Sequence, residues 1–343
     1  MKPGRIPKMN DKTEKKRLAV LRILKDADQP VGSSKIASQL LAMGHDLSER
    51  TIRFYLQGLD REGLTVNHGK RGRRITELGR RELETARVFE KVGFLNAKID
   101  QMTYRMNFDL ARRTGTVVIN MSVIAKDQLE RAAPLISRVF AGGFGMGELM
   151  TFFRPGERVG EITVPEGMVG IGTVCSITIN GVLLAQGIPT QSRFGGLLEL
   201  QGGKPARFVE IITYEGTSLD PLEVFIRSGM TDYTGAVESG NGRIGVGFRE
   251  VPAGARERVL ELAERLREAG MGAFMTIGWP GQPLLEIPVS EGRMGAIVIG
   301  GLNPVAILEE WGIRLHSRAL AGLADFSRLF RYTEMESRMR ELI

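Results

Sequence analysis

The residues best placed to do chemistry share one face of a short helix that we predict after Ser48. At 100° of rotation per residue, the apolar residues of this segment form one stripe, which consists of Ile52, Tyr55, Leu56 and Leu59. The opposite face carries Arg50, Phe54, Gln57 and Arg61, with Ser48, Thr51 and Arg53 beside it. Arginine pairs with guanine, glutamine with adenine, and an apolar ring can meet the methyl group of thymine. This face therefore predicts a helix that contacts DNA bases.

A basic hairpin is predicted directly after this helix. Residues 64–66 and 74–76 indicate two short strands, and the segment between them, Asn-His-Gly-Lys-Arg-Gly-Arg, is basic and rich in glycine. Basic side chains on such a hairpin suit DNA phosphates or the minor groove. The predicted DNA contacts of the hairpin are His68, Lys70, Arg71, Arg73 and Arg74.

Two earlier helices complete this module. We predict them over residues 15–27 and 33–43, separated by a Pro-Val-Gly break, with Ser33 as the cap of the second. Two helices, a helix with a polar face and a basic hairpin are typical of a winged helix-turn-helix domain. We assign this domain to residues 13–84 and the basic residues 1–12 to a flexible tail.

The distribution of charge supports a polyanion as the partner of this module. The formal net charge is +7, and residues 1–81 hold 19 Lys and Arg against 9 Asp and Glu, whereas the remainder holds 28 against 31. A cationic module joined to a near-neutral body favours a nucleic-acid reader coupled to a second function. A solvated basic face is the alternative that charge alone leaves open.

The composition excludes several classes of protein. One cysteine and three histidines build neither a disulfide framework nor a zinc cluster, so we expect no metal and a reducing cytoplasm. The sequence has no apolar run of the roughly 20 residues that span a membrane, and we expect no signal peptide. The Gly-x-x-x-x-Gly-Lys-Ser/Thr, His-Glu-x-x-His and Gly-x-Ser-x-Gly motifs are absent. We therefore expect no enzyme and no cofactor.

Apolar residues at alternating spacings of four and three follow the hairpin. They form a seam along a connector helix that we predict over residues 85–113, and they are Val88, Val92, Leu95, Ile99, Met102 and Met106. The seam is shorter than the three to four heptads that argue for a coiled coil. We predict a helix that joins two chains in a homodimer; a helix packed on its own body is the alternative.

The rest of the sequence, residues 114–343, indicates strands, glycine loops and amphipathic helices that are present twice. The segments Gly-Ile-Pro-Thr-Gln-Ser-Arg at 187–193 and Gly-Ile-Arg-Leu-His-Ser-Arg at 312–318 lie 125 residues apart, and an amphipathic helix precedes each at nearly the same offset. We predict divergent repeats over about 114–239 and 240–343. The fold class is thus α+β or α/β, with a winged helix-turn-helix, a connector helix and an α/β domain of two repeats.

Each repeated Ser-Arg segment carries donors for an anion. Hydroxyl and guanidinium groups match the geometry of a carboxylate, and glycine loops expose backbone N–H groups. A loop cap with a surface ion pair is the alternative for any single pair. We predict an anion pocket where the two repeats face each other, with Thr190, Gln191, Ser192, Arg193, His316, Ser317 and Arg318 as its binding residues.

Two segments of the body carry a resemblance to a known family. They are Tyr-Glu-Gly-Thr-Ser-Leu-Asp-Pro-Leu-Glu-Val-Phe-Ile-Arg-Ser-Gly-Met-Thr at 214–231 and Gly-Ile-Pro-Thr-Gln-Ser-Arg-Phe-Gly-Gly at 187–196. With the order of winged helix and body, the chain resembles the archaeal nitrogen-regulatory repressor family NrpR over nearly its whole length. The resemblance implies repression of nitrogen-assimilation genes at an inverted-repeat operator, and relief by 2-oxoglutarate. Some members carry two regulatory domains, whereas this chain has room for one. A second NrpR-type chain is therefore a candidate partner that would supply the other domain.

Two hypotheses from different classes follow. In the first, the chain is an effector-gated repressor whose partners are double-stranded operator DNA, 2-oxoglutarate as effector ligand, and a second copy. In the second, the body binds a metabolite or is an enzyme, and the winged helix serves protein assembly. Binding of an operator by the purified protein separates the two.

Overall fold

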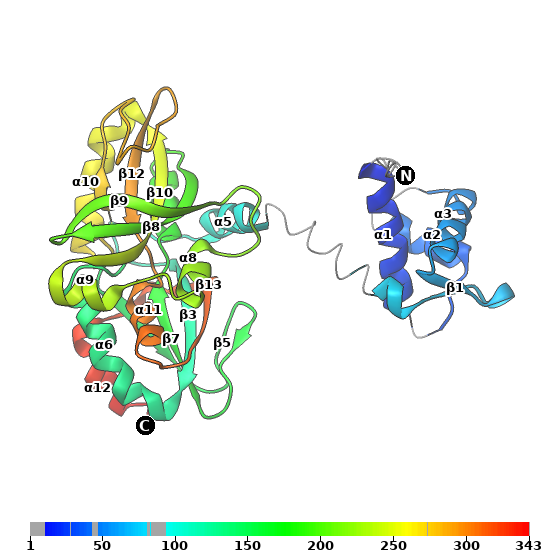
Figure 1. The fold of residues 1–343 in the computed structure, drawn as a ribbon, viewed down its shortest axis with the longest axis horizontal. Helices are drawn as coiled ribbons and strands as arrows, with labels where there is room; N and C mark the ends of the chain where they lie inside the picture. Colours follow the sequence, from blue (N-terminus) through cyan, green and yellow to red (C-terminus); the bar gives the residue numbers. More distant parts are fainter. Residues whose placement is uncertain are drawn as a thin grey trace, which may run out of the picture. The chain divides into compact units, whose positions relative to one another are not determined.

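The chain forms two compact units, which we describe one at a time. A computed structural model describes residues 11–27, 29–42, 47–80, 83, 94–272 and 274–342. The first unit covers residues 1–91 and the second covers residues 92–343 (Figure 1). Residues 1–10 of the predicted tail at 1–12 and the connector residues 85–93 lie outside the described residues. The last two tail residues, Asp11 and Lys12, belong to the first helix, which corrects the predicted boundary.

The first unit is the predicted winged helix. Its elements are α1 (Asp11–Lys25), α2 (Ser33–Ala42), α3 (Glu49–Arg61), β1 (Thr65–Asn67), the 3-10 turn η1 (Gly69–Arg71) and β2 (Arg73–Ile75). The Ser48 hydroxyl accepts a hydrogen bond from the Thr51 N–H and caps α3, as the sequence predicts. Val31 pairs with Arg73 beside the hairpin, and a side chain at Gly72 would collide with the Val31 carbonyl.

The second unit contains one order of elements twice. The first copy runs β3 (Thr116–Ala125), α6 (Leu129–Ala141), β4 (Leu149–Phe153), β7 (Met168–Val174), α7 (Ile177–Ala185) and β8 (Gln191–Gln201). The second runs β10 (Gly242–Pro252), α10 (Arg256–Glu268), β11 (Phe274–Ile277), β12 (Arg293–Ile299), α11 (Asn303–Glu310) and β13 (His316–Asp325). A 3-10 turn follows the first strand of each copy, η2 (Lys126–Gln128) and η3 (Ala253–Ala255). The predicted fold class, with two divergent α/β repeats, is confirmed.

The two copies exchange their last strands. Among the described residues, one antiparallel sheet has the order β11-β12-β10-β8-β9 and the other has the order β13-β3-β7-β4-β14. Strand β8 ends the first copy but pairs with β10 of the second, and β13 ends the second copy but pairs with β3 of the first. Helix α11 packs on α6 of the opposite copy. Each sheet therefore needs both halves of the unit, which sequence repetition did not indicate.

The remaining elements join and extend the two sheets. Strands β9 (Lys204–Thr213) and β14 (Phe330–Arg331) lie at their edges, and β5 (Arg158–Val159) and β6 (Ile162–Thr163) form a hairpin. Between the copies lie α8 (Pro221–Arg227) and α9 (Tyr233–Ser239), and η4 (Phe326–Arg328), η5 (Tyr332–Glu334) and α12 (Met335–Arg340) follow the second copy. Asp220 caps α8 and accepts hydrogen bonds from the Leu222 and Glu223 N–H groups, as its Asp-Pro sequence predicts.

Helix α5 (Phe94–Arg105) corrects the predicted dimer seam. Leu95, Ile99, Met102 and Met106 are buried in the core of their own unit, where α5 packs on α7. Their apolar surface is already covered within one chain, so it is not free to join two chains. Val88 and Val92 lie outside the described residues. The described part of the predicted connector therefore belongs to the body.

The burial of α5 predicts that its apolar face stabilises the fold. Ile99→Ala should lower the free energy of unfolding by about 2–5 kcal/mol, because it opens a cavity in a packed core. Tyr104→Ala, on the same helix at a side chain that is 85% exposed, is the control and should change it little. Urea denaturation measures stability and sedimentation measures mass. A fully stable Ile99→Ala variant of halved mass would restore the dimer seam.

Candidate functional site

The predicted base-contacting face of α3 is exposed. Arg50, Arg53, Phe54, Gln57 and Arg61 all lie on the surface, and Phe54 is 65% exposed. The opposite stripe is buried at Ile52, Leu56 and Leu59. Tyr55, which we predicted in that stripe, is half-buried. The amphipathic pattern of the sequence therefore places the polar face correctly.

The structure divides the side chains of this face into engaged and free ones. Arg53 donates to the Ser33 hydroxyl (3.1 Å) and pairs with Glu49 (3.1 Å), and Arg61 donates to the Gln57 carbonyl (3.3 Å). The Ser48 and Thr51 hydroxyls are hydrogen-bonded to each other (2.8 Å). Within the described part of the chain, the side chains of Arg50 and Gln57 have no hydrogen bond or ion pair. They are thus the polar groups of this face that are free for a ligand.

The basic hairpin is held to α3 by one carboxylate. Asp60 accepts from the Arg73 guanidinium (2.7 Å) and from the Thr65 hydroxyl (2.5 Å). His68, Lys70, Arg71 and Arg74 are exposed. The prediction of Arg73 as a DNA contact is therefore corrected, because its half-buried guanidinium is engaged with Asp60 and fixes the hairpin.

A pocket of about 430 Å³ lies where the first predicted Ser-Arg segment begins strand β8. Its wall contains four of the predicted anion-binding residues, Thr190, Gln191, Ser192 and Arg193. Helix α5 supplies a second wall through Asn96, Ile99 and Asp100. The remaining lining residues are Pro189, Thr213, Glu215 and Arg293. The strand that crosses between the two copies thus supplies Gln191, Ser192 and Arg193 to the lining of this pocket.

The lining of this pocket carries two guanidinium groups, Arg193 and Arg293, and two carboxylates, Asp100 and Glu215, and the buried carboxylate of Glu250 lies beside Arg193. Arg193 forms an ion pair with Glu250, whose side chain is fully buried, and Arg293 donates to the Glu250 carbonyl (3.3 Å). The Ser290 N–H donates to the Glu250 carboxylate (3.2 Å). Among the described residues, the Thr190 hydroxyl and the second carboxylate oxygen of Glu250 are buried without a hydrogen-bond partner. A buried hydroxyl of this kind is stabilised by a ligand that bonds to it.

A buried arginine supports the pocket from behind. The Arg249 guanidinium, 1% exposed, donates to Asn180 (3.2 Å) and to Ser176 (3.3 Å) and lies over the Tyr214 ring. Asn180 in turn donates to the Ser192 hydroxyl (3.0 Å). Sequence analysis missed this network and Glu250. The available signal was an Arg-Glu pair inside an apolar strand, which is unusual for charged residues unless they are paired.

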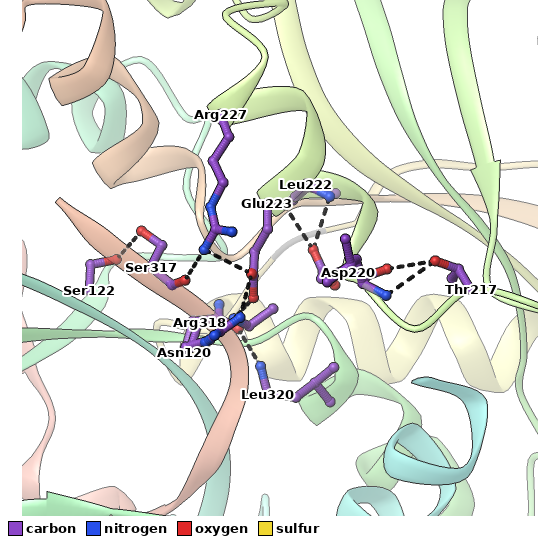
Figure 2. A network of polar contacts seen from close by, with 12 residues as sticks. Asn120, Ser122, Thr217, Asp220, Leu222, Glu223, Arg227, Ser317, Arg318 and Leu320 are labelled. Atoms are coloured by element: carbon purple, nitrogen blue, oxygen red, sulfur yellow. Dashed lines mark hydrogen bonds and ion pairs between the residues drawn. The ribbon is translucent and has the colours of Figure 1, made fainter. Parts of the chain in front are cut away.

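The second predicted Ser-Arg pair lies elsewhere. Ser317 is bonded to Ser122 of β3 (2.8 Å), and Arg318 and Arg227 each lie 3.5 Å from the buried carboxylate of Glu223 (Figure 2). His316 is exposed, and none of His316, Ser317 and Arg318 lines the 430 Å³ pocket. The prediction of one pocket formed by both pairs is therefore corrected. The two pairs lie in different sheets, because β8 pairs with β10 and β13 pairs with β3.

A smaller cavity is lined by residues of both copies. Its lining includes residues at matching positions of the repeats, Cys175 with Gly300 and Ser176 with Gly301, together with Asp220. Burial, and then the nearby carboxylate of Glu223, raise the pKa of Asp220 to about 6. Burial also raises the pKa of the Cys175 thiol to about 11, so this thiol is un-ionised at neutral pH.

The described ranges contain neither a cluster of metal-ligating side chains nor a helix of membrane-spanning character. No cluster of three His, Cys, Asp or Glu side chains there could hold a metal ion. No helix there is long and apolar enough to cross a membrane.

Family models match both units. Residues 92–331 match the NrpR regulatory domains NRD1 and 2, and residues 18–83 match the ribonuclease R winged-helix domain. A crystal structure of a nitrogen repressor-like protein from Methanococcus jannaschii aligns with a TM-score of 0.59 at 28% identity, over 69% of this chain and 97% of that one.

Similar sequences carry the name of one regulator. Global nitrogen regulator NrpRI of Methanosarcina mazei is 34% identical over 93% of this chain and 98% of its own length. Global nitrogen regulator NrpR of Methanococcus maripaludis is 28% identical over 92% of this chain, and that of Methanocaldococcus jannaschii is 33% identical over 85%. The chain spans 55% and 50% of these two longer relatives.

The raised pKa of Asp220 predicts a pH-dependent stability. Between the unfolded pKa of 3.8 and the folded value of about 6, the native state holds the proton more firmly, so the free energy of unfolding falls as pH rises through this window. Asp220→Asn keeps a capping oxygen, should remove this fall, and should be more stable than wild type at pH 8 by roughly 1–3 kcal/mol. Urea denaturation from pH 4 to 8 measures this difference.

The exposed Asp325 provides a control of opposite sign. Hydrogen bonds from the Ser327 side chain and backbone lower the pKa of Asp325, so its stabilisation is present above the unfolded pKa and is lost as pH falls. Asp325→Asn should therefore reduce stability at pH 8. Parallel pH profiles for wild type and Asp220→Asn would contradict the assignment of the shift to Asp220.

Proposed function

Because this chain belongs to the NrpR family of nitrogen regulators, we propose that it binds an inverted-repeat operator through its winged helix and represses nitrogen-assimilation genes until 2-oxoglutarate releases it. Its relatives are named as regulators, so the chain is a transcriptional regulator and not an enzyme. The observation that carries the DNA-binding part is the exposed face of α3 beside a basic hairpin.

The geometry of the first unit supports major-groove binding. A recognition helix needs a backbone that the fold holds in place and polar side-chain groups that have no partner within the protein. Arg50 and Gln57 meet this need, and Asp60 holds the hairpin next to the same helix through Arg73. Lys70, Arg71 and Arg74 are then positioned for phosphates or the minor groove.

The 430 Å³ pocket supports a dicarboxylate effector. Two negative charges leave water only where directed donors replace their hydration. Arg193 and Arg293 provide guanidinium groups, and the unpartnered Thr190 hydroxyl provides a third donor. The same lining includes the carboxylates of Asp100 and Glu215, so the dianion must lie against the two guanidinium groups and away from these acids. A carboxylate of 2-oxoglutarate would bind one N–H edge of the Arg193 guanidinium while Glu250 binds another, in the planar geometry that favours bidentate pairs.

Helix α5 supports a route from this pocket to DNA binding. It forms one wall of the pocket, and it is the first described element of the second unit. An effector that favours one placement of this helix would change operator affinity through its different affinity for two arrangements of the protein. By linkage, 2-oxoglutarate and operator would weaken each other's binding by the same factor.

An inverted-repeat operator calls for two readers, so the proposal includes a homodimer or a pair with a second NrpR-type chain. The apolar residues of α5 are buried within one chain and do not form this contact. Another surface must therefore join the two chains.

Substitutions in the first unit test the DNA-binding proposal. Arg50→Ala and Gln57→Ala should each reduce affinity for a selected operator by about 1–3 kcal/mol, because each removes a base contact. Lys70→Ala and Arg71→Ala should weaken all DNA alike and flatten the dependence on salt. Fluorescence anisotropy with selected and scrambled duplexes measures both effects. Wild-type operator affinity in the Arg50→Ala, Gln57→Ala double variant would exclude this helix face. If wild type binds no duplex, the assembly hypothesis replaces the repressor.

Substitutions in the pocket test the effector. Arg193→Ala should abolish 2-oxoglutarate binding in calorimetry, retain operator binding and prevent release. Arg318→Ala is the matched control, because Arg318 has the equivalent position in the other repeat and lies outside the pocket. Arg193→Ala also leaves Glu250 without its ion pair, so Thr190→Val provides a milder test with an expected loss of about tenfold. Unchanged affinity in both variants would exclude this pocket, and no binding in wild type would exclude the effector.

A further inference from the structure

The free face of α3 contains one large apolar group. Phe54 is 65% exposed, and its ring touches the neighbouring Tyr55 ring at a centroid distance of 6.2 Å. It lies between Arg50 and Gln57 in sequence, so the three side chains fall at positions i, i+4 and i+7 along one stripe of the helix. An exposed phenylalanine in this place has no role in the core of the unit.

The position of Phe54 in this stripe defines what it can contact in DNA. A helix rises about 1.5 Å per residue, so Phe54 lies about 6 Å along the axis from Arg50 and about 4.5 Å from Gln57. These separations correspond to one or two base steps of about 3.4 Å. Arg50 and Gln57 match hydrogen-bonding groups of bases, and the apolar group that a base pair presents in the major groove is the C5-methyl of thymine.

The charge around Phe54 favours DNA over an apolar protein partner. Arg50, Arg53 and Arg61 are exposed on the same helix as Phe54. The centre of a protein–protein interface is depleted of charged residues, whereas a DNA interface is rich in positive charge. Resting on the proposed function, we infer that Phe54 packs on the C5-methyl of a thymine in each operator half-site and makes affinity depend on that methyl group.

Replacement of thymine by uracil tests this contact, since it removes the methyl and keeps every hydrogen-bonding group of the base. The full chain is first used to select a duplex from a random library, and each thymine is then replaced in turn. Wild type should lose about fourfold in affinity at one position of each half-site, the effect expected for one buried methyl group. In Phe54→Ala, affinity should fall for the thymine duplex, and uracil at that position should cause no further loss.

Two variants sharpen the test. Leu78→Ala removes another exposed apolar side chain of the same unit, 54% exposed but outside α3, and should keep the full dependence on the methyl group. Phe54→Leu should keep part of the dependence of affinity on the methyl group. Equal uracil penalties in wild type and Phe54→Ala, or no penalty at any position in wild type, would overturn the inference while operator binding stands. Unchanged DNA affinity in Phe54→Ala would instead assign the ring to a protein partner. Failure to select any duplex would overturn the proposed function as well.

Discussion

The exchange of strands β8 and β13 is the constraint on which the second unit depends. Each strand completes the hydrogen bonding of a sheet that the other copy begins, so neither copy can satisfy its backbone groups alone. Because of the exchange, each Ser-Arg segment lies in the sheet of the opposite copy. Arg193 thereby meets Glu250, and Arg318 meets Glu223. A binding pocket, an ion-pair network and the union of the two copies follow from one topological feature.

The crossing strands are accompanied by buried polar groups. Arg249, Glu250 and Glu223 are buried, and each is paired or hydrogen-bonded. Removing one partner of a buried ion pair is strongly destabilising, whereas the intact pair adds little to stability. The loss of one partner would therefore cost more stability than the intact pairs contribute. The Thr190 hydroxyl and one Glu250 carboxylate oxygen are buried near them without a hydrogen-bond partner.

The first unit uses the same principle on a smaller scale. Asp60 accepts hydrogen bonds from Thr65 and Arg73, one on each strand of the hairpin, and so joins the hairpin to α3. Arg73, which we predicted as a DNA contact, thereby helps to position the other basic side chains of the hairpin. The same separation occurs on α3, where Arg53 and Arg61 are engaged within the protein and Arg50, Phe54 and Gln57 remain free.

The sequence alone determined the features that depend on residues close together in the chain. These are the polar and apolar faces of α3, its cap at Ser48, the basic hairpin, the cap of α8 at Asp220 and the duplication of the body. Tertiary structure decided the partners of residues far apart: α5 with α7, Arg73 with Asp60, and Arg193 with Glu250. The heptad spacing indicates that one face of α5 is buried, but it does not indicate which surface covers that face. The repeat indicates two copies, but it does not indicate which sheet the last strand of each copy joins. Both outcomes depend on which distant surfaces of the chain pack together most favourably, and local residue spacing carries no information about distant surfaces.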